Sequence, residues 1–213
     1  MTRRVLATRN AGWARALARR LGRAGIRPNA VSIAGVVFAF GASGAFYLAP
    51  DVSPGVRTVL LLLAATTIQL RLLCNLLDGM LAVEEGFKSK TGDIYNDLPD
   101  RVADVLILVG AGAAMRHVPY GSTLGWLAAL MAIFTAYVRL LGGSLGVTQH
   151  FIGPMAKQHR MFTLTIATLI SAVETMRGMP PRAMRVGLGL IVAGSIVTVW
   201  RRTHRIVSEV EAR

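Results

Sequence analysis

Apolar runs close to the length of a membrane crossing recur along the chain and constrain its fold more than any other feature. Six such runs extend over residues 30–49, 59–77, 102–115, 122–147, 161–173 and 183–200. A helix needs about 20 apolar residues to cross a bilayer, so the second, third and fifth runs must be extended by their polar flanks. The sequence therefore predicts an all-α integral membrane fold with six transmembrane helices.

The third run is short and follows a polar stretch. If its helix begins near Gly92, about 24 residues would extend over about 36 Å at 1.5 Å per residue. Such a helix can cross the bilayer with its first turns in a polar cavity. We therefore expect this helix to carry polar side chains into the membrane.

The composition agrees with a membrane protein and excludes a soluble nucleic-acid-binding protein. The chain is 53% hydrophobic and 16% charged, with 24 Lys and Arg against 11 Asp and Glu. A basic nucleic-acid module gains its charge on a polar surface, which this chain does not have enough polar sequence to form. The single cysteine, Cys74, excludes a disulfide framework and a cysteine-based zinc site. We expect the lipid bilayer, and no nucleic acid, as the environment of the chain.

The distribution of basic residues predicts the orientation. Most Lys and Arg residues lie in the N-terminal segment, in the second and fourth connections and after the last apolar run. Basic residues near span ends remain on the cytoplasmic side. We therefore expect a multi-pass protein of the cytoplasmic membrane with both termini in the cytoplasm.

Three segments are expected along the chain. Residues 1–27 are predicted to form an interfacial amphipathic helix, because Trp13, Leu17 and Leu21 recur every four residues between arginines. A solvated charged tail is the alternative for this segment. Residues 28–202 are expected to form the six-helix transmembrane domain, and residues 203–213 a cytoplasmic tail.

Acidic residues are concentrated in one part of this basic chain. Seven of the 11 lie between residues 78 and 104: Asp78, Glu84, Glu85, Asp93, Asp97, Asp100 and Asp104. On one helix the last four of these would lie within about 60° of one another. Such a stripe requires a divalent cation, cationic side chains or a water-filled cavity, and an oxygen-rich site suits Mg²⁺, Ca²⁺ or Mn²⁺. A solvated loop and helix start is the alternative.

The spacing of residues in this region resembles the signature of the CDP-alcohol phosphatidyltransferase family. That signature has an Asp, an Asp-Gly, an Ala-Arg, a Gly and two further Asp at fixed intervals. The corresponding residues here are Asn75, Asp78, Gly79, Ala82, Val83, Gly92, Asn96 and Asp100. The resemblance extends to the start of the first span, Pro28-Asn29-Ala30-Val31-Ser32.

The resemblance implies a transferase of phospholipid synthesis. Members of the family move a phosphatidyl or similar phospho-alcohol group from a CDP-alcohol, such as CDP-diacylglycerol, to an acceptor alcohol and release CMP. Divalent cations, Mg²⁺ or Mn²⁺, would neutralise the pyrophosphate, and a carboxylate would accept the proton of the attacking hydroxyl. The expected partners are a CDP-alcohol lipid, an acceptor alcohol and a second copy of the chain in a homodimer.

Carried over by position, the resemblance also implies residue roles. Asp100 would be the catalytic base and a metal ligand, together with the metal ligand Asp78. Asn75 and Asn96 stand where the family has its first and third aspartates, so the metal site has two fewer negative charges. Val83 replaces an arginine that contacts the CDP-alcohol. The residues expected at the substrate are Asn29, Ser32, Gly79, Ser89 and Gly92.

Further residues are candidates for the same site. They are Asp93, Asp97, Asp104, Arg139, Lys157 and Arg160. Arg139 and Arg71 lie within predicted spans, where they would either extend to the membrane surface or face the acidic cavity. Asp104 could pair with Arg71, Arg101 or Arg139.

Two other functions compete with the transferase. The chain could be a catalytically silent homologue that acts as a scaffold or partner in lipid synthesis. The substitutions at Asn75, Asn96 and Val83 fit either such a homologue or a divergent active subgroup, and the retention of Asp78, Asp100 and Asp104 favours the divergent subgroup. It could also be a small transporter with an acidic ion site, which predicts a carboxylate-lined path continuing to the far side. No such path is visible in the sequence beyond Asp104.

Overall fold

The structure is a computed structural model that describes residues 12–84 and 92–212, without the side chains of Val83, Glu84, Asp93 and Asn96. The described residues form helices and no strand. In chain order these are α1 (Gly12–Arg23), α2 (Pro28–Leu48), the 3-10 turn η2 (Ala49–Asp51), α3 (Pro54–Glu84), α4 (Gly92–Ala113), α5 (Gly121–Ser144), α6 (Lys157–Met176) and α7 (Arg182–Glu211). The all-helical prediction is therefore confirmed.

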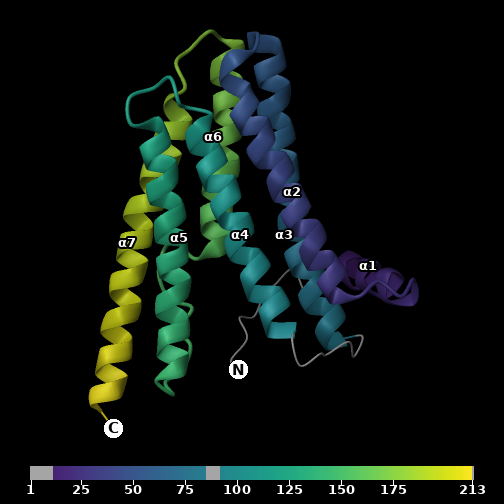
Figure 1. Ribbon diagram of the computed structural model, residues 1–213, viewed down its shortest axis with the longest axis vertical. Helices are drawn as coiled ribbons and strands as arrows, with labels where there is room; N and C mark the ends of the chain where they lie inside the picture. The colour runs from purple at the N-terminus through teal and green to yellow at the C-terminus, as the bar shows by residue number, and fades with distance from the viewer. Residues whose placement is uncertain (1–11, 85–91, 213) are drawn as a thin grey trace.

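The first helix lies across the long helices instead of along them (Figure 1). Ala14 and Ala18 of α1 are buried in a cluster with residues of α2 and α3, and Leu17 packs against the same cluster. Trp13 is exposed. Helix α2 then begins at Pro28, where proline loses no hydrogen bond because the first turn has no helical acceptor. The described part of the predicted interfacial helix is thus amphipathic, and residues 1–11 lie outside the described residues.

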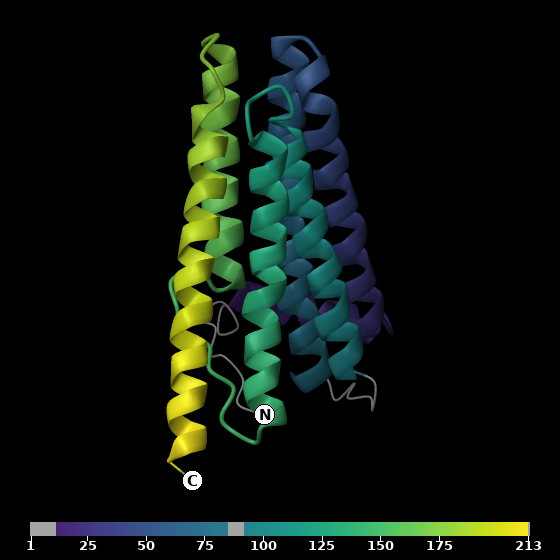
Figure 2. The same cartoon turned by 60° about the vertical axis from the view of Figure 1, so that its left-hand side comes forward.

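The six long helices form a ring. Around it, α2 packs on α3, α3 on α6, α6 on α7, α7 on α5, α5 on α4, and α4 on α2. Consecutive helices run in alternating directions, as Figures 1 and 2 show. The last turns of α3, α5 and α7 therefore lie at the same end of the bundle as the first turns of α2, α4 and α6.

Small residues allow the helices to approach closely. A Cβ atom added at Gly112 of α4 would lie 2.7 Å from the Cα atom of Gly125 in α5. Added at Gly125, it would lie 2.6 Å from the Cα of Gly112. Membrane helices commonly use small residues in this way, because backbone contact replaces the hydrophobic driving force available in water.

Four stretches of the described chain are long and apolar enough to cross a membrane: Pro28–Asp51, Pro54–Ala82, Gly121–Ser144 and Arg182–Glu211. This is the architecture expected of an integral membrane protein. Helices α4 and α6 complete the ring but carry more charge, so the count of six crossings stays a prediction. Helix α4 begins at Gly92, as expected. Helix α7 continues to Glu211, so no break in secondary structure marks the predicted tail at residue 203.

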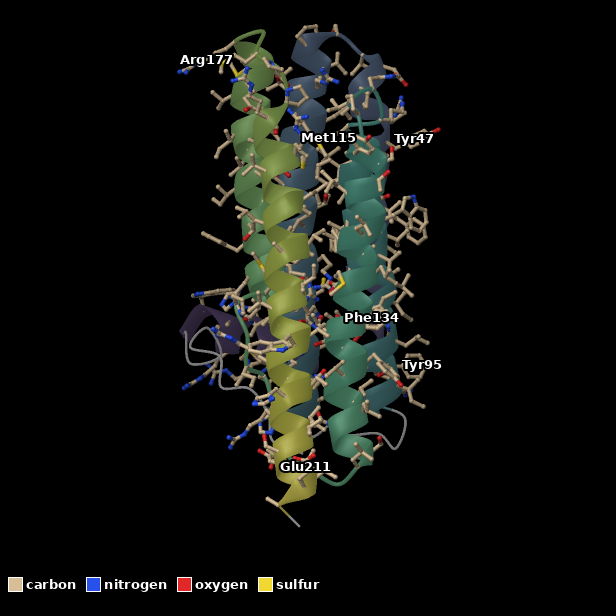
Figure 3. All side chains as sticks on the ribbon, turned by 90° about the vertical axis from the view of Figure 1, so that its left-hand side faces the viewer. Tyr47, Tyr95, Met115, Phe134, Arg177 and Glu211 are labelled. Atoms are coloured by element: carbon tan, nitrogen blue, oxygen red, sulfur yellow. The ribbon has the colours of Figure 1, made fainter. Side chains whose placement is uncertain are left out.

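The end of the bundle where α2 passes into α3 has its own polar contacts. Asp51 pairs with Arg116 and with His117, and Arg116 also stacks on the Tyr47 ring. Figure 3 shows Tyr47 and Arg177 toward this end, and Tyr95 and Glu211 toward the other. The acidic cluster lies at the end of Tyr95 and Glu211, because it is carried by the last turns of α3 and the first turns of α4.

Candidate active site

A cavity of about 180 Å³ opens where five helices meet at the end that carries the acidic cluster. Its lining comes from the last turns of α3, α5 and α7, the first turns of α4 and α6, and the connection between α5 and α6. The lining residues are Asn75, Asp78, Gly79, Asp97, Asp100, Arg101, Thr135, Ala136, Arg139, Phe151, Ala156, Lys157, Gln158, Arg160 and Arg202. Sequence positions up to 127 residues apart thus meet at one site.

Helices α3 and α4 bring three of the predicted site residues together. Asn75 and Asp78 lie one turn apart on α3, and the Asn75 amide donates to both carboxylate oxygens of Asp100, at 3.1 and 3.2 Å. The Ser32 hydroxyl of α2 donates to Oδ2 of Asp78 at 2.7 Å. Oδ1 of Asp78 is buried and has no hydrogen-bond partner among the described residues. Asp78 therefore offers one acceptor atom that the described protein does not use.

The acidic stripe of α4 is matched by basic side chains from four helices. Asp104 pairs with Arg71 of α3 at 2.8 Å and with Arg160 of α6 at 3.0 Å. Arg71 also contacts Asp100, at 3.3 Å, and Lys157 forms an ion pair with the same carboxylate. These contacts link three helices through buried charge.

The outermost described member of the stripe has partners of its own. Asp97 accepts from Arg139 of α5 at 2.9 Å, and from Arg101 of its own helix at 3.5 Å. The Arg139 guanidinium lies over the Phe151 ring, with its central carbon 5.5 Å from the ring centroid. Asp97 and Arg139 are more exposed than the inner pairs, so they form the rim of the cavity.

Cationic side chains thus balance the described acids of the stripe. Of the three compensations considered from the sequence, this is the one that the structure displays for Asp97, Asp100 and Asp104. Arg71 is 1% exposed, so the alternative that it extends to the membrane surface is wrong. Arg139 also faces the cavity. Arg71 was among the partners anticipated for Asp104, whereas Arg160, 56 residues further along the chain, was not.

The charged side chains in the first turn of α6 have the sign that the helix dipole disfavours. Helix N-termini carry a partial positive charge and favour acidic residues. Here the first turn has no acidic residue and instead carries Lys157 and Arg160. The two cations are stabilised across the cavity by Asp100 and Asp104. A local preference overridden in this way is typical of functional sites.

The other predicted site residues differ in where they lie relative to the cavity. Gly79 lines the cavity, and Ser32 reaches it through Asp78. Asn29 lies half-buried in the first turn of α2, and Gly92 is the first residue of α4. Ser89 and the side chains of Asp93 and Asn96 lie outside what the structure describes.

Seven residues that line the cavity were not among the predicted site residues: Arg101, Thr135, Ala136, Phe151, Ala156, Gln158 and Arg202. Arg202 is 5% exposed and donates to the Thr135 carbonyl at 2.5 Å and to the Ile152 carbonyl at 3.0 Å. The Thr135 hydroxyl accepts from Arg160 at 3.0 Å. Arg202 follows an apolar run directly, where arginine commonly anchors a helix at the membrane surface, so the sequence carried no signal for its burial.

The donor set fits a hard divalent cation in part. The described residues contain no group of three His, Cys, Asp or Glu side chains that could hold a metal ion. However, the buried Oδ1 of Asp78 has no hydrogen-bond partner within residues 12–84 and 92–212, and Asn75 lies one turn away on the same helix. Carboxylate and amide oxygens are ligands that Mg²⁺ and Mn²⁺ accept. Of the described site residues, Asp78 is thus the one whose carboxylate is most available to bind a metal ion.

Comparison with known proteins gives a fold and one sequence relative. The chain matches no known protein-family model. It is 24% identical over 157 residues to an uncharacterized protein of Aquifex aeolicus (strain VF5), a match that covers 72% of this chain and 73% of the relative.

The fold is shared with phosphatidylinositol phosphate synthase of Mycobacterium tuberculosis. The crystal structure with CDP-DAG bound superposes with a TM-score of 0.77 at 22% identity, covering 92% of this chain and 94% of that chain. The complex with manganese and citrate gives a TM-score of 0.74 at 22% identity, covering 91% and 88%. The apo form gives 0.71 at 22% identity, covering 88% and 93%. At this level of identity the similarity establishes the fold.

Proposed function

We propose that the chain is a membrane transferase of the CDP-alcohol phosphatidyltransferase family. It would move a phosphatidyl or similar phospho-alcohol group from a CDP-alcohol such as CDP-diacylglycerol to an acceptor alcohol. The observation that carries the proposal is the cavity that holds Asn75, Asp78 and Asp100 at the signature spacing. The fold supports it, because a synthase with this fold has been crystallised with CDP-DAG.

The proposed reaction is a substitution at phosphorus. The acceptor hydroxyl oxygen forms a bond to the phosphorus that carries the lipid alcohol, the bond from that phosphorus to the CMP oxygen breaks, and CMP leaves. Asp100 accepts the hydroxyl proton. The Asn75 amide and the Arg71 guanidinium fix the direction of the Asp100 carboxylate. Such positioning lowers the barrier because the base is held in place before the reaction.

The cations of the cavity are suited to the phosphates of the donor. Lys157, Arg160 and Arg139 line the cavity together with the carboxylates. Five basic and three acidic side chains line it in all. A net positive lining attracts a pyrophosphate and stabilises the charge that develops on departing CMP. Asn29, Ser89 and Gly92 remain proposed contacts of the substrate.

A divalent cation, Mg²⁺ or Mn²⁺, is proposed as the cofactor. Asp78, Asp100, Asn75 and Asn96 are the positions at which the resemblance implies metal ligands. When bound, it would supply charge neutralisation to the pyrophosphate. The manganese complex of the structural neighbour supports a divalent cation of this type. The proposed setting is the cytoplasmic membrane, with both termini in the cytoplasm and two copies of the chain in a homodimer.

A catalytically silent homologue is the second candidate, and one observation favours it. Both oxygens of Asp100 already have partners, from Asn75, Arg71 and Lys157. Neither oxygen of Asp100 is left without a partner, whereas a general base or a metal ligand needs an oxygen free to accept. A scaffold or partner in lipid synthesis would preserve these contacts for stability alone.

A transfer assay distinguishes the two. Purified protein in nanodiscs is given CDP-diacylglycerol, a panel of acceptor alcohols and Mn²⁺ or Mg²⁺, and CMP release is measured. The proposal expects release that requires metal and is lost in Asp78→Asn and Asp100→Asn. Asp51→Asn makes the same chemical change at the other end of the bundle and should leave release unchanged. Absence of release with every acceptor, together with no metal-dependent thermal shift by CDP-diacylglycerol, would establish the silent homologue.

A further inference from the structure

Positive charge is concentrated on one side of the candidate site, around Asp100. Its carboxylate pairs with Lys157 and with Arg71, and the Arg101 guanidinium lies 3.9 Å from Oδ2. The N-terminus of α6, which begins at Lys157, adds the partial positive charge of a helix dipole. One carboxylate thus faces three cationic side chains and a helix N-terminus.

Asp78 has the opposite surroundings. It is 5% exposed, and its Oδ2 accepts a neutral hydroxyl donor, Ser32. Its Oδ1 is buried without a hydrogen-bond partner among the described residues. A buried carboxylate oxygen without a donor is unfavourable, and a cation bound from outside the protein would compensate it.

The charges available at the signature positions limit how many cations can bind. Asp78 and Asp100 supply two negative charges, whereas Asn75 and Asn96 supply none. Two divalent ions placed side by side would bring four positive charges next to Lys157 and Arg71. Repulsion between charges a few ångströms apart in a partly buried site is strong. One divalent ion at Asp78 avoids this repulsion.

We propose that the chain binds a single divalent cation, at Asp78, and that the Lys157 ammonium takes the place of a second one at Asp100. The inference rests on the proposed transferase function, in which a positive charge beside Asp100 would act on the phosphates of the donor. Lys157 can do this without coordination geometry, because an ammonium is a compact point charge with three donors. With Asn at positions 75 and 96 the site has fewer negative charges to hold a second metal ion, and the Lys157 ammonium on α6 supplies the positive charge instead.

The test is the number of Mn²⁺ ions bound per chain. The full chain in nanodiscs is dialysed against Mn²⁺ in the presence of CMP, and bound metal is counted by mass spectrometry and by Mn²⁺ electron paramagnetic resonance. We expect one ion per chain in the unmodified protein and in Lys157→Arg. Lys157→Met should bind Mn²⁺ at least about tenfold more tightly, because the repelling charge is gone. The triple variant Asn75→Asp/Asn96→Asp/Lys157→Met is expected to bind two Mn²⁺ ions per chain.

Each other outcome has a definite meaning. Two ions in the unmodified protein would overturn this inference and leave the transferase intact. Unchanged Mn²⁺ affinity in Lys157→Met would overturn the role of Lys157. No bound Mn²⁺ would overturn both the inference and the metal requirement of the proposed function. Arg116→Met removes a cation at the far end and should not change Mn²⁺ binding, and elution of every variant as a single peak in size-exclusion chromatography checks folding.

Discussion

Arg71 and Asp104 form an ion pair of 2.8 Å at the centre of the bundle, and each residue is only 1% exposed. Arg160, also 1% exposed, binds the other oxygen of Asp104 at 3.0 Å. The pair connects α3 to α4, and Arg160 adds α6. Because Arg71 also contacts Asp100, this buried charge network fixes the position of the proposed catalytic base.

Removing Arg71 is expected to destabilise the protein strongly. Arg71→Met leaves Asp104 with one cationic partner and removes one of the partners of Asp100. Loss of one member of a buried ion pair typically costs about 3–5 kcal/mol of stability. Thermal unfolding in detergent, followed by intrinsic fluorescence, measures the effect. Arg101→Met is the control, because its pair with Asp97 is partly exposed and should contribute at most about 1 kcal/mol. Equal melting temperatures for the two variants would contradict a structural role for the network.

Ser32 is expected to act as a positioning residue for Asp78. Ser32→Ala leaves both oxygens of the buried carboxylate without a described donor, a change worth about 1–3 kcal/mol, or roughly 5- to 160-fold in rate. We expect the metal concentration for half-maximal CMP release to shift along with the rate. Ser32→Thr retains the hydroxyl and should recover most of the activity. A threonine variant as impaired as the alanine variant would argue that the site needs the size of Ser32 and not its hydrogen bond.

The contact between Gly112 and Gly125 is expected to tolerate no side chain. A methyl group at Gly112 would overlap the α5 backbone and force α4 and α5 apart, at a cost of about 1–3 kcal/mol. Gly44→Ala is the matched control, because nothing lies within 4 Å of a Cβ atom at that position. Thermal melting of Gly112→Ala and Gly44→Ala should therefore differ. A Gly112→Ala variant as stable as the control would show that the two helices are not in contact.

Chelation of divalent cations is expected to stop CMP release without unfolding the protein. Asp97, Asp100 and Asp104 are balanced by basic side chains, so the fold does not depend on a metal ion. Addition of a chelator should abolish release, and Mn²⁺ or Mg²⁺ should restore it, while the melting temperature changes by no more than a few degrees. A collapse of the melting temperature would instead assign the metal a structural role.

Much of the architecture could be predicted because hydrophobicity is a local property of the chain. The apolar runs correspond to the long helices, and α4 begins at Gly92, the start considered from the sequence because it would give the short third run the length of a crossing. The resemblance to the signature also predicted Asn75, Asp78 and Asp100 at one site, and these three residues line the same cavity. The tail after Trp200 was harder, because a helix can continue beyond the membrane without an apolar pattern.

Arg71 was among the partners anticipated for Asp104, but most partners of the acids could not be predicted, because pairing depends on which helices are neighbours. In sequence, Arg71, Arg160 and Arg202 have the pattern of residues that anchor helix ends at a membrane surface. In the ring, α3, α6 and α7 turn these residues inward, where each is at most 5% exposed. Nothing in the sequence near Arg202 indicates that it meets Thr135.

The sequence by itself determined the all-helical class of fold, since apolar runs close to the length of a membrane crossing are a local property of the chain, and its resemblance to the signature indicated the candidate site residues. Only the tertiary structure decided how the charges are compensated. It placed Lys157 against Asp100 and left Oδ1 of Asp78 without a partner among the described residues. The physical reason is that electrostatic energy depends on distances in space, and residues 57 positions apart in the chain acquire those distances only when α4 and α6 are assembled in the ring.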